Sequence, residues 1–339
     1  MSQFCEPCAP IEKENNNENE NENENEKIPP SQRNITPHDV IDIKDDDDSI
    51  VIIGTRGSKV TRLSSLNSMT CLSTLTLRSC LISSIKGIES PNLTTLTKLE
   101  LYDNQIEDIN GIESLTNLII LDLSYNGIRD MSPVSNCVLL EELYIAQNKL
   151  RKIEGLNNMQ NLRTLDLGAN RIRLMEGLDN LTSLQSLWLG KNKIETIACI
   201  GNLPKLRQLD IQNNRITSIG EGQIQNLVSL EELYLACNAI EVFDNFPTNS
   251  PLGTLDLSYN KIVSMQGVEL LTNLEELWMT KSLLESYDDL LPLTKLNGLK
   301  CLYLEHSPVA KDFEYRMKLT KLIPTLEQLD ATVVTRWDK

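Results

Sequence analysis

The feature that most constrains this chain is an internal repeat. The pattern L-x-x-L-x-L-x-x-N-x-I returns through most of the sequence, in steps of 22 residues with two steps of 24. Clear copies start at Leu72, Leu96, Leu118, Leu140, Leu162, Leu184, Leu206, Leu230, Leu252 and Leu274, and degenerate copies start at Ile50 and Leu299. A unit this short cannot bury its own leucines, so successive units must stack and share one continuous core.

This spacing is the leucine-rich-repeat signature, and it predicts an α/β solenoid of about twelve repeats. Leucines at the first, fourth and sixth positions should point inward, and the asparagine at the ninth position should bond backbone groups where the strand turns. The return along the outside is short. A 3₁₀ segment rises about 2.0 Å per residue against about 1.5 Å for an α-helix, so it covers that gap with fewer residues. We therefore expect a curved parallel β-sheet on the concave face and mostly 3₁₀ turns on the convex face.

The composition divides the chain into three segments. Residues 1–49 hold 14 Asp or Glu against 4 Lys or Arg, and the stretch ENNNENENENENE within them has no apolar residue. Such a segment cannot offset the entropy of ordering, so we expect a disordered acidic tail rich in Asn and Glu. Residues 50–309 should form the solenoid, and its first, degenerate copy has Ile50 and Ile53 at hydrophobic positions. Residues 310–339 should form a C-terminal cap.

The cap is expected to close the open end of the solenoid. Residues 311–322 are predicted to be helical, with Phe313, Met317 and Leu319 or Leu322 covering the last core layer. Pro324 should end this helix, and the segment 326–329 should start a final edge strand.

The fifth position of each unit lies between two buried leucines, so its side chain points to the opposite, concave face. Over nine consecutive units this position alternates between an acid and an aromatic residue until its last member. The column consists of Asp122, Tyr144, Asp166, Trp188, Asp210, Tyr234, Asp256, Trp278 and Tyr303. With neighbouring strands ~4.8 Å apart, it forms a ladder roughly 38 Å long.

Cross-strand packing would explain an isolated tyrosine on such a face. It does not explain rings aligned over the whole ladder, because solubility favours small polar residues on an exposed sheet. Aromatic anchors surrounded by charge are typical of protein interfaces, and the aspartates favour a partner with Lys or Arg. The pattern therefore predicts a protein-binding concave face.

Catalysis is not expected. The only histidines are His38 and His306, so no Ser-His-Asp or Cys-His set can be assembled. Cys5 and Cys8 have the spacing of metal ligands but lack a second pair, so we expect no metal site and no cofactor.

A net charge of −16 argues against general affinity for nucleic acid or anionic membranes. The scattered cysteines and the absence of a signal-peptide pattern favour an intracellular protein with reduced thiols.

The stretches LDLGANRIRLMEGLDNLTSLQSLWLGKNKI, ELWMTKSLLESYDDL, CLYLEHSP, EYRMKL and LEQLDATVV resemble the leucine-rich-repeat regulatory subunit family of type 1 protein phosphatase, known as regulatory subunit 7. The resemblance spans about residues 50–335. It implies a non-catalytic regulatory subunit that binds the catalytic subunit of a Ser/Thr protein phosphatase through its concave face. It also implies control of phosphatase activity, maturation or localisation, a nuclear and cytoplasmic location, and a further phosphatase regulator in a ternary complex.

By this resemblance, the partner-binding residues are Asp122, Tyr144, Asp166, Trp188, Asp256, Glu276, Trp278 and Tyr303, with Asp210 and Tyr234 as additional candidates. The family usually has phenylalanine where this chain has Tyr144 and Trp188, and glutamate where it has Asp166. The residues alone leave two alternatives open. One is a leucine-rich-repeat subunit of a spliceosomal particle, and the other is a cytoskeletal or axonemal scaffold.

Overall fold

The computed structural model describes residues 46–54, 66, 68–89, 91–248, 250–335 and 338. The predicted tail lies outside these residues except for its last four positions. Cys5, Cys8 and His38 lie outside them as well.

Among the described residues, fourteen strands form one sheet whose spatial order follows the sequence. They are β1 (Ser49–Ile53), β2 (Thr74–Arg78), β3 (Lys98–Glu100), β4 (Ile120–Asp122), β5 (Glu142–Tyr144), β6 (Thr164–Asp166), β7 (Ser186–Trp188), β8 (Gln208–Asp210), β9 (Glu232–Tyr234), β10 (Thr254–Asp256), β11 (Glu276–Trp278), β12 (Cys301–Tyr303), β13 (Gln328–Leu329) and β14 (Thr332–Val333). All neighbours are parallel except β14, which pairs antiparallel with β13.

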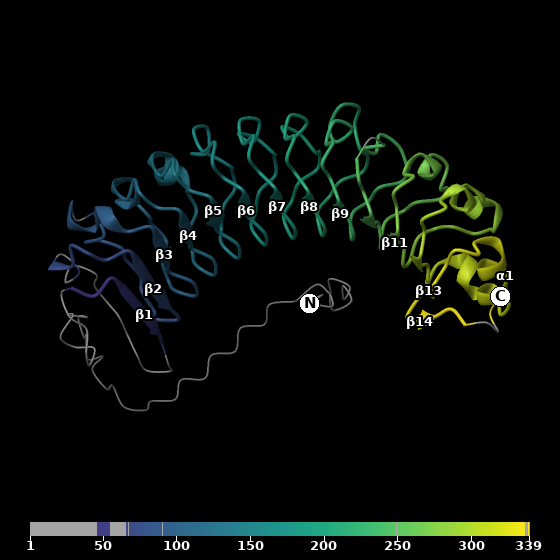
Figure 1. The fold of residues 1–339 in the computed structure, drawn as a ribbon, viewed down its shortest axis with the longest axis horizontal. Coiled ribbons are helices and arrows are strands. Elements are labelled where there is room, and N and C mark those ends of the chain that lie inside the picture. Colours follow the sequence, from purple (N-terminus) through teal and green to yellow (C-terminus); the bar gives the residue numbers. More distant parts are fainter. Residues whose placement is uncertain are drawn as a thin grey trace, which may run out of the picture.

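Figure 1 shows the resulting arch, with the strands along its inner side and the turns along its outer side. The predicted parallel solenoid is therefore confirmed, with twelve parallel strands from β1 to β12 that enclose eleven turns. No helix in the described part of the chain is both long and apolar enough to cross a membrane.

The core runs between the sheet and the outer turns as one continuous cluster. In a typical strand such as β7, the central Leu187 is fully buried while the two flanking residues are half-buried. Leu184 and Leu189 are fully buried too, so the first, fourth and sixth positions of this unit face inward as predicted. Each unit thus contributes one layer to a core that no unit could form alone.

The asparagines at the ninth position form a buried ladder that links neighbouring units. The Nδ2 of Asn170 donates to the carbonyls of Ile145 at 2.9 Å and Leu167 at 3.0 Å, and its Oδ1 accepts the backbone N–H of Leu150 at 3.0 Å. Each amide therefore satisfies backbone groups of its own unit and of the unit before it, which confirms the predicted role.

The convex returns contain short 3₁₀ helices towards the two ends of the arch. They are η2 (Pro91–Thr95), η3 (Ile112–Ser114), η4 (Ser132–Asn136), η5 (Val268–Leu270), η6 (Asp288–Lys295) and η7 (Pro308–Lys311). The central returns contain isolated i→i+3 hydrogen bonds instead, such as Leu181 N to Leu178 O at 3.1 Å. A glycine follows in many units, and Gly155 has a φ of 81°, a conformation that favours glycine.

The first copy of the repeat has a different register from the predicted one. Ile50 pairs with Leu75 and Ile52 with Leu77, so Ile50 occupies the fourth position of its unit. As a consequence Ile53 lies past the core and is 67% exposed. The sequence suggested the wrong register because three further β-branched apolar residues, Val51, Ile52 and Ile53, follow Ile50 directly.

The cap is smaller than predicted and presents a different face to the core. Helix α1 spans Tyr315–Leu322, ends before Pro324, and buries Tyr315 and Leu319. The prediction was wrong for Phe313, which is 94% exposed and precedes the helix, and for Met317, which is 42% exposed. The helix begins at Tyr315 and not at residue 311, so Tyr315 and Leu319 face the core in place of Phe313 and Met317. A strand forms within the predicted segment 326–329 as β13, but β14 pairs with it and lies at the edge of the sheet instead.

Candidate functional site

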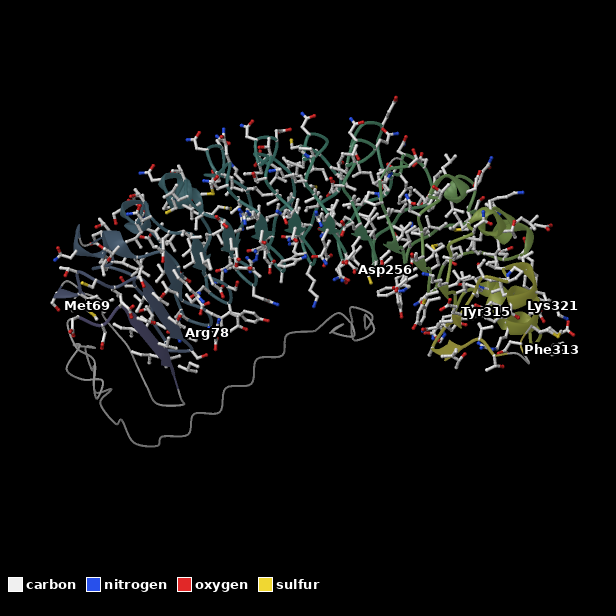
Figure 2. All side chains as sticks on the ribbon, viewed as in Figure 1. Met69, Arg78, Asp256, Phe313, Tyr315 and Lys321 are labelled. Carbon is white, nitrogen blue, oxygen red and sulfur yellow. The ribbon has the colours of Figure 1, made fainter. Side chains whose placement is uncertain are left out.

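The concave ladder exists as a continuous row of paired residues. Strand registers place Asp122 beside Tyr144 and Tyr144 beside Asp166, and the same pairing continues without a break to Trp278 and Tyr303. Figure 2 shows Asp256 on the inner side of the arch, whereas Phe313 lies at its C-terminal end. All nine residues of the column therefore line one face, and Glu276 lies on the same face two residues before Trp278.

Each aspartate of the ladder is anchored by its own backbone. The Oδ1 of Asp166 accepts the N–H of Gly168 at 2.8 Å, and Asp210 accepts the N–H of Gln212 at 2.9 Å. Asp122 and Asp256 make the same bond with the residue two positions later. This local bond fixes the side chain, so each carboxylate keeps a defined position on the face.

Burial raises the pKa of all four aspartates of the ladder. The effect is largest at Asp166, where burial, together with the negative charges of Asp210 and Asp122, raises the pKa to about 6. Ionised carboxylates on this face are thus poorly solvated in the free protein. A cationic group brought by another molecule would relieve that cost.

The five aromatic residues of the ladder are half-buried, and polar residues on the neighbouring column form hydrogen bonds with four of them. The hydroxyls of Tyr144 and Tyr234 each donate to a glutamate two residues earlier at 2.9 Å, namely Glu142 and Glu232. The Nε1 of Trp188 donates to the Oε1 of Gln208 at 3.1 Å.

Sequence reasoning missed these tethering residues. The signal was the repeated Glu-Leu-aromatic triplet, which occurs at 142–144, 232–234 and 276–278. In the third triplet, Glu276 entered the prediction only through the family resemblance.

At the C-terminal end of the ladder the rings form a cluster. The ring of Trp278 lies 6.3 Å from that of Tyr234 and 6.1 Å from that of Tyr303, measured between centroids. Trp278 and Tyr234 belong to strands two apart, so their rings lean together across the strand that carries Asp256. Asp256, which lies between them, is only 8% exposed.

The N-terminal end of the ladder carries a different arrangement. Glu100, which pairs with Asp122 in the sheet, accepts ion pairs from Arg78 at 3.0 Å and Lys98 at 2.9 Å. The Arg78 guanidinium also lies over the Tyr102 ring at 5.6 Å. Charge is therefore balanced within the protein at this end, and the unbalanced carboxylates begin at Asp122.

The face combines half-buried aromatic rings with fixed carboxylates. No group of three or more His, Cys, Asp or Glu residues in the described ranges is arranged to hold a metal ion. Acid–base catalysis would need carboxylates that converge on one point. The carboxylates of this face alternate with rings instead.

Comparison with known sequence families identifies the repeats independently. Families described as leucine-rich repeats match residues 94–136, 138–180, 182–222, 204–262 and 234–339. Together these matches run from residue 94 to residue 339 apart from residues 137 and 181.

Two of the similar curated proteins are phosphatase regulators. Protein phosphatase 1 regulatory subunit pprA of Dictyostelium discoideum is 39% identical over 74 residues, which cover 22% of this chain and 21% of that protein. Protein phosphatase 1 regulatory subunit 7 of Homo sapiens is 44% identical over 52 residues, which cover 15% of this chain and 14% of that protein. The chain therefore matches about a fifth or less of the length of these relatives.

A solved leucine-rich-repeat protein of Leptospira interrogans has the same fold, with a TM-score of 0.71 and 25% identity over 80% of this chain and 70% of that chain. The repeats, the solenoid and the sequence relatives agree. The chain is a leucine-rich-repeat protein related to regulatory subunits of protein phosphatase 1.

Proposed function

We propose that this protein is a non-catalytic regulatory subunit that binds the catalytic subunit of protein phosphatase 1 through its concave face. The names of its relatives supply the class of partner. The observation that carries the proposal is the ladder of half-buried rings, most of them held by a hydrogen bond and interleaved with carboxylates. Water solvates such a surface poorly, whereas a complementary protein could pack against the rings and pair with the carboxylates.

The rings would act as anchors. Buried aromatic side chains at an interface often account for ~2 kcal/mol or more of binding free energy each. Because Tyr144, Trp188 and Tyr234 are already held by hydrogen bonds, little side-chain freedom remains to be lost on binding. The buried Nε1 of Trp278 has no hydrogen-bond partner within the described residues, so an acceptor on the bound protein would satisfy it.

The carboxylates would select the partner and orient it. Among the residues that the structure describes, no basic side chain lies within salt-bridge distance of Asp122, Asp166 or Asp210. These carboxylates therefore favour a partner that presents Lys or Arg side chains. In the cell, this binding would control phosphatase activity, maturation or localisation in the nucleus and cytoplasm. The convex face would stay free for a further regulator in a ternary complex.

The direct test replaces Trp188 and Trp278 together by alanine. We expect the affinity for the phosphatase catalytic subunit, measured by titration calorimetry, to fall about 100-fold or more, since two anchors are lost. The matched control is the pair Phe313→Ala and Met317→Ala, which removes two exposed apolar side chains outside the concave face. Circular dichroism and thermal unfolding would establish that both variants fold. Full affinity in the folded tryptophan variant would contradict the proposed site.

A further inference from the structure

The flank where the strands end carries a dense group of basic residues, here called the basic flank. Its members occupy the four positions that follow the repeat asparagine in consecutive central units. They are Arg129, Lys149, Arg151, Lys152, Arg171, Arg173 and Lys193. The Lys149 N–H bonds the carbonyl of Ile128, and Arg171 and Lys193 continue this ladder in the next two units. The basic side chains therefore emerge from neighbouring rows about 5 Å apart.

Most of this charge has no counter-ion within the folded part of the protein. Lys149 lies 3.4 Å from Glu107, but the structure shows no ion pair within 4 Å for the other six residues in the described ranges. Five of them, Arg129, Arg151, Lys152, Arg171 and Arg173, are exposed. The acids at equivalent positions of the same units are Asp130 and Glu195, and Glu195 already contacts Arg215. The basic flank therefore has a net positive charge on a chain whose total is −16.

The same chain contains a segment of opposite charge and of matching chemistry. Residues 14–26 hold six glutamates, separated by asparagines and without any basic or apolar residue. Because it has nothing to bury, this segment can associate only through charge and hydrogen bonds. An arginine-rich surface provides both.

The connection between the two is long enough. Nineteen residues, 27–45, separate Glu26 from the first described residue, Asp46. Fully extended they reach ~65 Å. The basic flank lies three to six strands from β1, or ~14–29 Å along the sheet, and the tail must also cross the length of one strand. Tethering of this kind gives a local concentration in the millimolar range, at which weak ionic contacts are populated.

We infer that the acidic segment 14–26 docks on the basic flank of its own solenoid and thereby competes with other polyanions for this surface. The concave face is left open, so the contact is independent of phosphatase binding. The association is ionic and therefore reversible and salt-dependent. A partner with a denser acidic segment would displace the tail and gain access to the flank.

Carbodiimide coupling of the full-length protein tests this inference, because it joins a carboxylate to a lysine amine in contact with it. Lys149, Lys152 and Lys193 report on the flank, and the exposed Lys205, Lys295 and Lys321 serve as reference lysines. At low salt we expect mass spectrometry to find glutamates 14–26 coupled to the flank lysines at least about tenfold more often than to the reference lysines. At 0.5 M NaCl this preference should disappear. Equal coupling to both sets, or a preference that salt does not change, would overturn the inference.

A charge-reversal variant provides a second measurement. Arg151→Glu, Arg171→Glu and Arg173→Glu together keep all three reporter lysines and alter only exposed positions. Coupling of the tail to Lys152 should fall about tenfold. The matched control is Lys205→Glu, Lys295→Glu and Lys321→Glu, which changes the net charge equally and should leave coupling to the flank intact. Loss of coupling in both variants would show a general charge effect and would contradict docking at the flank.

The nature of the ligand is tested with a labelled peptide of residues 12–28. It should bind several-fold more tightly to a full-length variant with the six glutamates of 14–26 changed to glutamine than to the native chain, whose own tail competes. A single-stranded oligonucleotide of the same charge is the comparison probe. If the oligonucleotide binds the native flank and the peptide does not bind the glutamine variant, the flank is a nucleic-acid site and the inference is wrong.

Discussion

At the residue scale, the carboxylates of the ladder are the most unusual groups. Asp166 is fixed by the N–H of Gly168, but burial raises its pKa to about 6. The folded protein therefore holds the Asp166 proton more tightly than the unfolded chain does. Its favourable contribution to stability is complete below the unfolded pKa near 4 and is lost as the pH rises through 6. At neutral pH the free protein keeps the Asp166 carboxylate ionised although it is largely buried, a cost in stability that is typical of a binding site.

Asp166→Asn should therefore stabilise the free protein at pH 7.5. The asparagine oxygen keeps the bond with Gly168 and cannot ionise. A shift of about two pKa units corresponds to ~3 kcal/mol, which partial exposure reduces to ~1–2 kcal/mol. Urea denaturation should show this gain at pH 7.5 and none at pH 4. Asp108→Asn is the control, since Asp108 makes the same type of backbone bond on an exposed turn and should change stability by less than ~0.5 kcal/mol. A loss of stability in the Asp166 variant at pH 7.5 would contradict this assignment.

At the element scale, the stability of each turn depends on the asparagine ladder as much as on the leucines. The strands β3 to β12 are only three residues long, so few backbone bonds hold each unit to the next. The side chain of Asn170 adds bonds to Ile145, directly after the preceding strand β5, and to Leu150 of the preceding turn. The asparagine is predictable from sequence because its partners are backbone groups, which are present whatever the neighbouring side chains are.

Asn170→Ala should lower the free energy of unfolding by ~2–4 kcal/mol, because it leaves several buried backbone groups without partners. Asn202→Ala removes an asparagine from an exposed turn and should change stability by less than ~0.5 kcal/mol. Urea denaturation of both variants measures the difference. Equal stabilities would show that water replaces the Asn170 amide and that the ladder is dispensable.

At the scale of the whole molecule, the arch is a one-dimensional stack with a cap at its C-terminal end. The C-terminal end is covered by α1, whose Leu319 is fully buried, and by the β13–β14 pair. The last unit has a neighbour on one side only, so the cap determines how easily the stack opens from that end. Phosphatase binding as proposed would use β4 to β12, and an opened end would remove Trp278 and Tyr303 from the ladder first.

Leu319→Ala should therefore destabilise the C-terminal turns selectively. Removing a fully buried leucine costs ~2–5 kcal/mol, and this loss should appear as faster amide hydrogen exchange in β11 to β13 than in β4 to β6. Met317→Ala, on the exposed side of the same helix, is the matched control and should leave exchange near that of the native protein. A uniform increase along the whole arch would contradict the one-dimensional picture.

The sequence by itself determined the repeat, the inward leucines, the asparagine ladder and the column of alternating acids and rings. It could do so because stacking equal units in register places equivalent positions side by side. Only the tertiary structure decided that Glu142 and Gln208 tether rings of the ladder, that Trp278 and Tyr234 lean together over Asp256, and that Phe313 faces solvent. Periodicity specifies the face on which a side chain lies, whereas its conformation and burial depend on neighbours from other units and on where the cap helix begins.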